Sequence, residues 1–232
     1  MRLVIVGNGK MGRAVAELAE ERGHVVHAVI GRGENARGAA LTAERLRGLD
    51  VAIEFTRPDA VATNLERLIE AGIPTVTGTT GWDAELPRIA RLVEARRGAL
   101  LHSANFSVGV QLFLRAARDL AARFAGRPEF DSSILEEHHA AKLDAPSGTA
   151  VALRGRLRES DPAREFPITS VRAGSIPGTH VVTYDGPYDT VALSHVARSR
   201  RGFAAGAVAA AEWLPGRPGV HDFEEMLFGG AG

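Results

Sequence analysis

The stretch that decides the fold is Leu3-Val4-Ile5-Val6-Gly7-Asn8-Gly9-Lys10-Met11-Gly12, near the start of the chain. Its apolar run, residues 3–6, is typical of a buried parallel strand, and residues 13–21 are predicted to form a helix. A Gly-x-Gly-x-x-Gly pattern is weak evidence alone, but between a strand and a helix it indicates a dinucleotide-binding turn. The first two glycines permit a tight turn and the approach of a pyrophosphate, and the third lets the helix pack closely on the strand. The alternative is an ordinary glycine-rich turn.

Four more short apolar segments follow in the first half of the chain, and segments of helical character separate them. We expect strands of one parallel sheet at residues 24–30, 50–55, 74–77 and 99–102, with helices at residues 58–71, 83–95 and 110–124. The loops after the strands are rich in small and hydroxyl-bearing residues. Because open parallel sheets bind ligands at the carboxyl ends of their strands, these loops are candidate cofactor contacts.

The turn after the second strand bears on the choice of cofactor. An acidic residue commonly stands there and binds the ribose hydroxyls of NAD. Here the next residues are Gly31 and Arg32, and the first carboxylate is that of Glu34. Arg32 is therefore a candidate contact to the 2′-phosphate of NADP, and the alternative is that it points to solvent. We predict that both NADPH and NADH are used, with NADPH at least as good.

A second informative stretch is Glu136-Glu137-His138-His139-Ala140-Ala141-Lys142-Leu143-Asp144-Ala145-Pro146-Ser147-Gly148-Thr149-Ala150. A predicted strand enters it and a predicted helix leaves it, with Ser147 as the N-cap. The N–H groups of Gly148 and Thr149 would be free to bind an anion at the start of that helix. With His139 and Lys142 nearby, the loop is suited to hold a carboxylate or phosphate and to supply a proton. An ordinary solvated turn is the alternative.

Two adjacent histidines also raise the question of a metal. If the strand continues through His138 and His139, their side chains point to opposite faces and cannot easily share one ion. The chain has no cysteine and no further pair of spaced histidines. Proton chemistry is therefore favoured over metal binding, and no metal is predicted.

The second half of the chain has a different pattern. Strands are predicted at residues 130–136, 168–173, 180–184 and 191–196, with a hairpin around residues 185–187. We therefore predict an α/β protein with two domains. A Rossmann-like dinucleotide-binding domain is formed by residues 1–106 and 215–232, and residues 107–214 form an α+β substrate-binding domain with an open mixed sheet.

The Glu-x-His-His-x-x-Lys-x-Asp-x-Pro-Ser-Gly-Thr-Ala pattern of residues 136–150 resembles the signature of the 4-hydroxy-tetrahydrodipicolinate (dihydrodipicolinate) reductase family. Residues 50–56 resemble another segment of that family, with Glu54 in place of an aspartate. The resemblance implies NAD(P)H-dependent reduction of 4-hydroxy-tetrahydrodipicolinate to tetrahydrodipicolinate, with loss of water, in lysine and diaminopimelate biosynthesis. It also implies that His138 is the acid/base and Lys142 the proton donor. His139, Gly148 and Thr149 would hold the carboxylates of the substrate.

The resemblance extends to the loops of the first half, where residues 78–82 and 104–110 are similar to segments that contact the cofactor in this family. It therefore implies NADPH or NADH as the cofactor. With the glycine-rich turn, the predicted cofactor-binding residues are Gly7, Asn8, Gly9, Lys10, Met11, Gly12, Arg32, Gly78, Thr79, Thr80, Ser103, Ala104, Asn105 and Phe106.

Composition limits the remaining classes. The 232 residues carry no net charge, so nothing in the total favours nucleic acid or a membrane as a partner. The opening apolar run is too short for a signal peptide or a membrane span, which favours the cytoplasm. Family members are usually homotetramers, and we expect the same here. The rival predictions are another small nicotinamide dehydrogenase and a non-catalytic nucleotide sensor.

Overall fold

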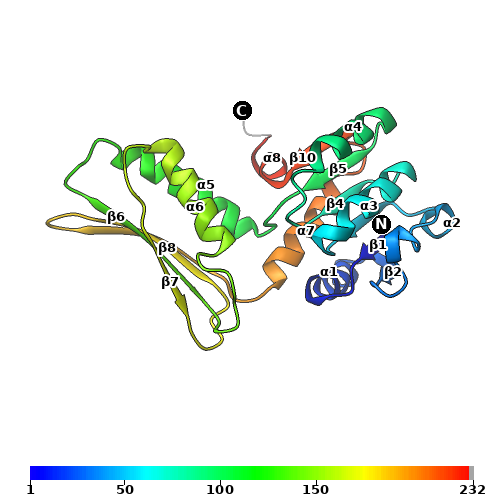
Figure 1. Ribbon diagram of the computed structural model, residues 1–232, viewed down its shortest axis with the longest axis horizontal. Coiled ribbons are helices and arrows are strands. Elements are labelled where there is room, and N and C mark those ends of the chain that lie inside the picture. The colour runs from blue at the N-terminus through cyan, green and yellow to red at the C-terminus, as the bar shows by residue number, and fades with distance from the viewer. Residues whose placement is uncertain (230–232) are drawn as a thin grey trace. The chain divides into compact units, whose positions relative to one another are not determined.

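The computed structural model describes residues 1–229, and they divide into two compact units (Figure 1). Unit 1 consists of Met1–Ser107 and the segment that begins at Arg200, and unit 2 is Val108–Ser199. The first boundary is within one residue of the predicted one. The second lies at 199/200 rather than 214/215, and residues 230–232 of the predicted segment lie outside the described residues.

The displaced boundary has a packing cause. Helix α7 (Arg201–Trp213) buries Ala204, Ala207 and Val208 in the same core cluster as Leu3 and Ile5. Residues 201–213 were predicted to belong to the substrate-binding domain, but the core that they join is that of unit 1. Its alanine-rich face gave no indication of which domain it would cover.

Unit 1 contains a six-stranded sheet in the order β10-β5-β4-β3-β1-β2, in which every pairing is parallel. The order reverses between β1 and β3, and such a switch point is where open α/β sheets bind ligands. This confirms the predicted α/β class. The strands are β1 (Arg2–Val6), β2 (Val25–Ile30), β3 (Val51–Glu54), β4 (Thr75–Thr77), β5 (Ala99–His102) and β10 (Gly219–Asp222).

Both faces of this sheet are covered, and the period-two pattern of β1 shows why. Leu3 and Ile5 point into the cluster formed with α1 and α7, whereas Val4 and Val6 belong to a second cluster on the other face. A parallel strand with two buried faces is apolar at every position, as this run is. The helices of unit 1 are α1 (Lys10–Glu21), α2 (Ala43–Leu46), α3 (Pro58–Glu70), α4 (Leu86–Arg96), α7 and α8 (Phe223–Phe228), with a 3-10 turn η1 at Ala36–Gly38.

Unit 2 is a four-stranded mixed sheet in the order β7-β6-β8-β9, with α5 (Val108–Phe124) and α6 (Gly148–Ser160) on one face (Figure 1). The predicted open sheet and its hairpin are both present. Strand β6 runs parallel to β7 and antiparallel to β8, and β8 pairs antiparallel with β9. The strands are β6 (Asp131–His138), β7 (Ile168–Arg172), β8 (Thr179–Asp185) and β9 (Thr190–Val196).

Strand β6 is longer than predicted, and the difference matters for the site. It continues beyond Glu136 to His138, because β7 and β8 supply partners as far as His138 and Glu137 respectively. Glu136 and His138 therefore project from the same face of one strand.

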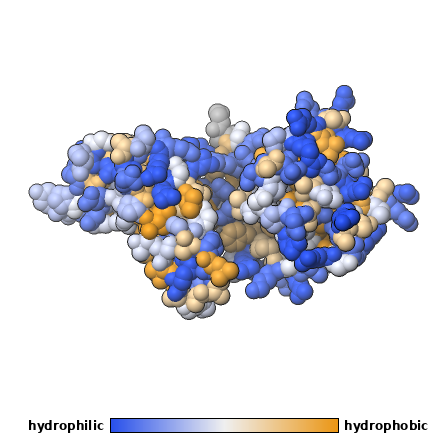
Figure 2. All heavy atoms as spheres, in the orientation of Figure 1, coloured by the Kyte–Doolittle hydropathy of each residue, from blue (hydrophilic) through white to orange (hydrophobic). Residues whose placement is uncertain are grey.

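The surface of both units is mostly hydrophilic in the view of Figure 2, and apolar residues show as separate small groups. Among the helices of residues 1–229, none combines the length and the apolar character that a bilayer crossing requires.

Candidate active site

The glycine-rich turn of unit 1 has the geometry that its spacing predicts. Gly7 has a φ of +115°, and a Cβ placed there would lie 2.0 Å from the Phe55 carbonyl oxygen. A Cβ on Gly12 would lie 1.8 Å from the Gly7 carbonyl oxygen, so no side chain fits at either position. Gly9, in contrast, has open space where a Cβ would be. Gly7 and Gly12 shape the turn, and Gly9 leaves the start of α1 uncovered.

The start of α1 is suited to an anion. Gly9 is the N-cap residue, and no side chain caps the helix there. The first N–H groups of a helix lack intrahelical partners, and the helix dipole favours negative charge at that end. A pyrophosphate fits this position because the missing side chain at Gly9 permits close approach.

A pocket of about 420 Å³ lies against this helix start. It brings together six of the predicted cofactor residues: Gly9, Lys10, Met11, Gly78, Thr79 and Thr80. Sequence reasoning did not assign four further lining residues to the site: Phe55, Thr56, Pro58 and Arg200. Phe55, Thr56 and Pro58 lie in the segment that follows β3. Their position at the carboxyl end of a predicted buried strand could have indicated that they belong to the site.

A smaller pocket of about 130 Å³ shares Thr79 and Thr80 with the first one and is lined by Ser103 and Ala104, among others. Asn105 and Phe106 lie outside both pockets. The Phe106 ring is buried and packs against Phe223, with 5.0 Å between ring centroids. The Phe106 ring is thus not accessible to a cofactor.

The turn after β2 brings in a carboxylate to which sequence reasoning gave no role. The Gly31 N–H donates to Glu34 Oε1 at 3.2 Å, and Arg45 donates to Glu34 Oε2 at 3.0 Å. The Gly31 hydrogen bond is the main cause of the lowered pKa of Glu34, followed by the hydrogen bond from the Arg45 side chain. Arg32 is exposed. The Glu34 carboxylate therefore lies at the end of β2, where it binds the N–H of Gly31.

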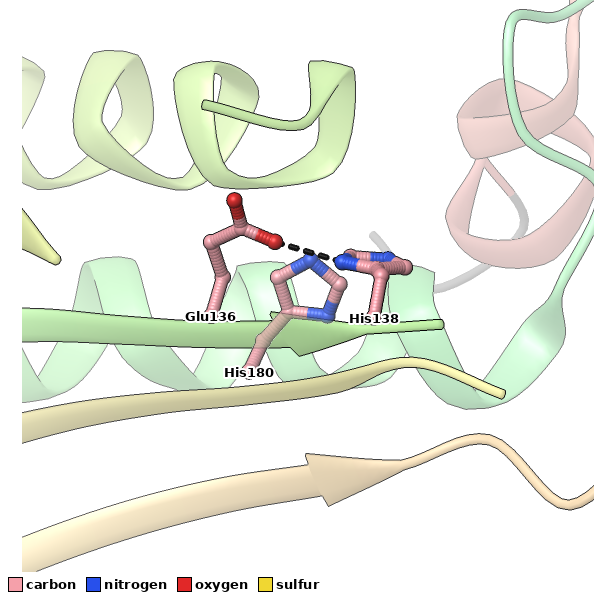
Figure 3. Close-up of side chains that lie close together, drawn as sticks. All are labelled: Glu136, His138 and His180. Carbon is pink, nitrogen blue, oxygen red and sulfur yellow. Dashed lines mark hydrogen bonds and ion pairs between the residues drawn. The ribbon is translucent and has the colours of Figure 1, made fainter. Parts of the chain in front are cut away.

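In unit 2, strand pairing assembles a cluster of charged and titratable side chains. His138 on β6 is opposite Arg172 on β7, and Glu136 is opposite His180 on β8. Figure 3 shows Glu136, His138 and His180 together, with Glu136 hydrogen-bonded to His138. The Glu136 Oε2 to His138 Nδ1 distance is 2.5 Å, and the His138 and His180 rings are 5.2 Å apart.

Glu136 is the anionic centre of this cluster. Its side chain is fully buried, and it accepts hydrogen bonds from Arg172 Nη2 at 2.6 Å and from the Ser147 N–H at 3.2 Å. Burial alone would raise its pKa, but the hydrogen bonds from Arg172, Ser170 and His138 lower the pKa to about 2. Glu136 is therefore ionised near neutral pH.

An ionised Glu136 fixes the tautomer of His138. A carboxylate only accepts, so Nδ1 must carry the hydrogen and neutral His138 keeps a lone pair on Nε2. Burial lowers the pKa of His138, Glu136 opposes that change, and Lys142 and Arg172 add to it. Gly178 leaves room at Nε2, since a Cβ there would lie 3.2 Å away. The cluster can accept and return a proton at one defined atom.

Glu136, His138 and His180 also lie close enough to share a metal ion, since one ligand atom of each falls within 4.8 Å of the others. However, Arg172 already neutralises Glu136, and Glu136 is hydrogen-bonded to the ring that would bind the ion. The arrangement suits a hydrogen-bonded proton-transfer group better than a cation site. The sequence did not indicate His180 as a site residue, because only the pairing of β6 with β8 brings it next to Glu136.

The loop that follows β6 holds the other predicted substrate residues. Ser147 caps α6 as predicted, with its Oγ accepting the Ala150 N–H at 3.2 Å. Lys142 Nζ donates to Asp144 Oδ1 at 2.8 Å. The Lys142 hydrogen bond is the main cause of the lowered pKa of Asp144, and the Gly148 N–H contributes as well.

The other predicted substrate residues, His139, Gly148 and Thr149, belong to the same loop and to the start of α6. His139 is partly exposed, and its carbonyl oxygen accepts the Lys142 N–H at 3.0 Å, which closes the turn. Gly148 and Thr149 form the first turn of α6. The loop thus presents a lysine and a helix start that together already bind one carboxylate, that of Asp144.

Comparison with known proteins places both halves of the chain in one family. The family model described as "Dihydrodipicolinate reductase, N-terminus" matches residues 1–106, and "Dihydrodipicolinate reductase, C-terminus" matches residues 109–227. The chain is similar to the 4-hydroxy-tetrahydrodipicolinate reductases of Christiangramia forsetii (33% identity, 98% of both chains) and Natronomonas pharaonis (36% identity, 98% of this chain and 100% of the relative).

A solved structure shares the fold. It is the dipicolinate-bound dihydrodipicolinate reductase from Paenisporosarcina sp. TG-14, with a TM-score of 0.81 and 23% sequence identity. The similarity covers 97% of this chain and 99% of that chain.

Proposed function

Because the chain belongs to the dihydrodipicolinate reductase family, we propose that unit 1 binds the nicotinamide cofactor and that unit 2 binds the substrate and moves the protons. The chain is an oxidoreductase of lysine and diaminopimelate biosynthesis. Its reaction is the NAD(P)H-dependent reduction of 4-hydroxy-tetrahydrodipicolinate to tetrahydrodipicolinate, with loss of water.

The residues of unit 1 fit a dinucleotide. The uncapped start of α1 and the open space at Gly9 suit the pyrophosphate, and the loop of Gly78, Thr79 and Thr80 lines the same pocket. When bound, the reduced cofactor supplies a hydride. The small side chains of the loop permit close contact with a flat ring, and the hydroxyls supply hydrogen bonds.

His138 and Lys142 are assigned to proton transfer, and the observation that supports this is the Glu136–His138 pair. Loss of water needs an acid for the departing hydroxyl, and reduction of the ring needs a proton for the negative charge that develops. His138 Nε2 can receive or give a proton while Nδ1 stays hydrogen-bonded to Glu136. Lys142 contributes an ammonium group whose charge stabilises a developing anion.

The Asp144 contact indicates how the loop would bind the substrate. The Asp144 carboxylate stands where an anionic ligand would be expected, between Lys142 Nζ and the Gly148 N–H. Its side chain is 58% exposed, so an incoming carboxylate can displace it at little cost. We assign His139, Gly148 and Thr149 to the carboxylates of the substrate on this basis.

The assignment is tested with His138→Gln and Lys142→Ala, with His27→Gln as the control because His27 is an exposed histidine of unit 1. Turnover of the dihydrodipicolinate synthase product is followed as loss of reduced cofactor, and NADPH binding is measured by its fluorescence. Turnover should fall about a hundredfold or more in both variants, with little change in NADPH affinity. Near-normal turnover would remove the role of that residue.

We also propose a homotetramer that forms through the face of the unit 2 sheet opposite α5 and α6. Leu135 and Val181 are paired on neighbouring strands there and are only partly buried, and Val196 is exposed. Sedimentation of the intact chain at several concentrations gives the assembly state. A Val196→Lys variant that sediments like wild type would exclude that residue from the interface.

A further inference from the structure

Glu54, at the end of β3, is a buried acid to which the reaction assigns no role. Its side chain is fully buried, and within residues 1–229 it forms no ion pair with a lysine, arginine or histidine. Burying a carboxylate costs several kcal/mol unless a cation or hydrogen bonds compensate it. An acid at this position is therefore expected to have a function beyond packing.

Neutral side chains supply all of its hydrogen bonds. Thr77 Oγ1 and Thr79 Oγ1 donate to Oε2 at 2.6 and 2.7 Å. Asn64 Nδ2 donates to Oε1 at 3.3 Å, and Thr56 Oγ1 donates to the same oxygen. Burial raises the pKa of Glu54 although these four hydrogen bonds lower it. The carboxylate is held in place by hydroxyl and amide groups from β4, from α3 and from the loops that follow β3 and β4.

Two of these partners line the proposed cofactor pocket. Thr79 Oγ1 donates to Glu54 and accepts the Thr56 N–H at 2.8 Å, so the loops that follow β3 and β4 are tied together. Thr56 and Thr79 both line the 420 Å³ pocket. The Trp82 indole N–H donates to the Thr79 carbonyl oxygen at 2.8 Å, which adds a second fixed point to the loop.

The network also reaches the turn after β2. Asn64 Oδ1 accepts from Asn35 Nδ2 at 2.9 Å, and Asn35 Oδ1 accepts the Ala40 N–H at 3.2 Å. The same turn contains Arg32, the candidate contact to the 2′-phosphate of the cofactor. One carboxylate is thereby connected to loops at both ends of the expected dinucleotide.

We propose that Glu54 is a positioning residue for the cofactor, whose carboxylate holds the Thr79 loop in the conformation that binds the reduced nicotinamide dinucleotide. The inference rests on the proposed function, in which unit 1 binds that cofactor. Glu54 itself does not line the pocket and acts through Thr79 and Thr56.

Glu54→Gln tests the inference because it keeps the shape and replaces one accepting oxygen with a donor. Oε2 accepts from two threonines and Oε1 from Thr56 and Asn64, so an amide cannot satisfy both sides. The Kd of NADPH, measured by its fluorescence, should rise about tenfold, as expected from the loss of one buried hydrogen bond. The KM of the substrate should change less than twofold.

Thr75→Val is the matched control. Thr75 is buried in the same strand as Thr77, and its Oγ1 donates to the Ile73 carbonyl oxygen at 2.9 Å without contacting Glu54. This variant should lower the melting temperature and leave the NADPH Kd unchanged. An equal rise of the Kd in both variants would show a general loss of stability and overturn the inference.

A double-mutant cycle with Thr79→Val identifies the route of the effect. If Glu54 acts through Thr79, Glu54→Gln should change the Kd by less than threefold in the Thr79→Val background. Full additivity would contradict that route. In a Trp213→Phe background, the emission of Trp82 reports on the loop directly, and Glu54→Gln should shift it.

The two proposals fail in different ways. If the wild-type chain bound neither NADPH nor NADH, the proposed function would be wrong. If wild type bound the cofactor and Glu54→Gln bound it equally tightly, only the positioning role of Glu54 would be lost.

Discussion

Glu54 in unit 1 and Glu136 in unit 2 are both fully buried at or near the end of a strand, yet they are held in opposite ways. Glu136 pairs with the Arg172 guanidinium, and its pKa is lowered to about 2 in spite of burial. Among the described residues Glu54 has only neutral hydrogen-bond donors, and burial raises its pKa. One carboxylate is compensated by a charge, and the other by hydroxyl and amide groups.

The difference follows from what each site must do. The site of unit 1 is made of backbone turns and small side chains, so its carboxylate serves to fix loops. In the proposed function the site of unit 2 moves protons, and a charged Glu136 holds His138 in one tautomer. Substitutions in unit 1 should therefore change cofactor binding, and substitutions around Glu136 should change turnover and its pH dependence.

The largest effect is expected from a methyl group at Gly12, with Gly9 as the matched position. In Gly12→Ala the Cβ would lie 1.8 Å from the Gly7 carbonyl oxygen, so α1 must move away from β1. Unit 1 should lose about 3 kcal/mol or more of stability, together with cofactor binding. Gly9→Ala meets no atom within 4 Å and should fold normally while binding NADPH more weakly. Thermal unfolding and NADPH fluorescence measure both; equal stability of the two variants would refute the steric argument.

The next effect concerns Glu136→Gln, which tests whether charge matters in unit 2. Losing the carboxylate frees the tautomer of His138, and kcat should fall about a hundredfold. Glu136 raises the pKa of His138, so its loss should move the limb of the pH profile due to His138 to lower pH. Glu137→Gln is the control, because Glu137 lies on the opposite face of β6. An unchanged limb with reduced kcat would mean that Glu136 acts on folding alone.

His180 gives a prediction for stability against pH. Burial is the main cause that lowers the pKa of His180 to about 4, whereas in the unfolded chain it is near 6.5. The unfolded state then binds more protons between these values, so stability is present above pH 6.5 and is lost as the pH falls towards 4. Between pH 7 and 5 the loss should be about 2 kcal/mol. Urea unfolding at both pH values should show a smaller loss in His180→Gln than in wild type, and an identical loss would count against burial as the cause.

The smallest effect concerns the two cofactors. Wild type should use both, with NADPH at least as good as NADH. Arg32→Ala should lower kcat/KM for NADPH selectively, by about three- to tenfold, and less at moderate salt because the contact is exposed. Glu34→Gln should favour NADPH, since it removes a negative charge at the end of β2. Equal losses with both cofactors, or a strong wild-type preference for NADH, would show that Arg32 does not reach a phosphate.

Local patterns were sufficient for much of the fold. The glycine spacing at residues 7–12, the apolar run of β1 and the Ser147 cap depend on neighbours in the chain, and each is present as predicted. The predictions that failed depended on distant partners. Helix α7 was assigned to the wrong domain because an alanine-rich helix carries no mark of the surface it will cover.

What the sequence by itself determined is the class of the protein: a Rossmann-like unit, a second mixed-sheet unit, and the residues 136–150 that place it in its family. Those features are local, because backbone sterics and side-chain periodicity act over a few residues. Only the tertiary structure decided that His180 and Arg172 surround Glu136, that Glu34 returns to the end of β2, and that Glu54 is buried among three threonines and an asparagine. Strand register and burial set these contacts, and both depend on residues far apart in the chain that meet only when the sheets form.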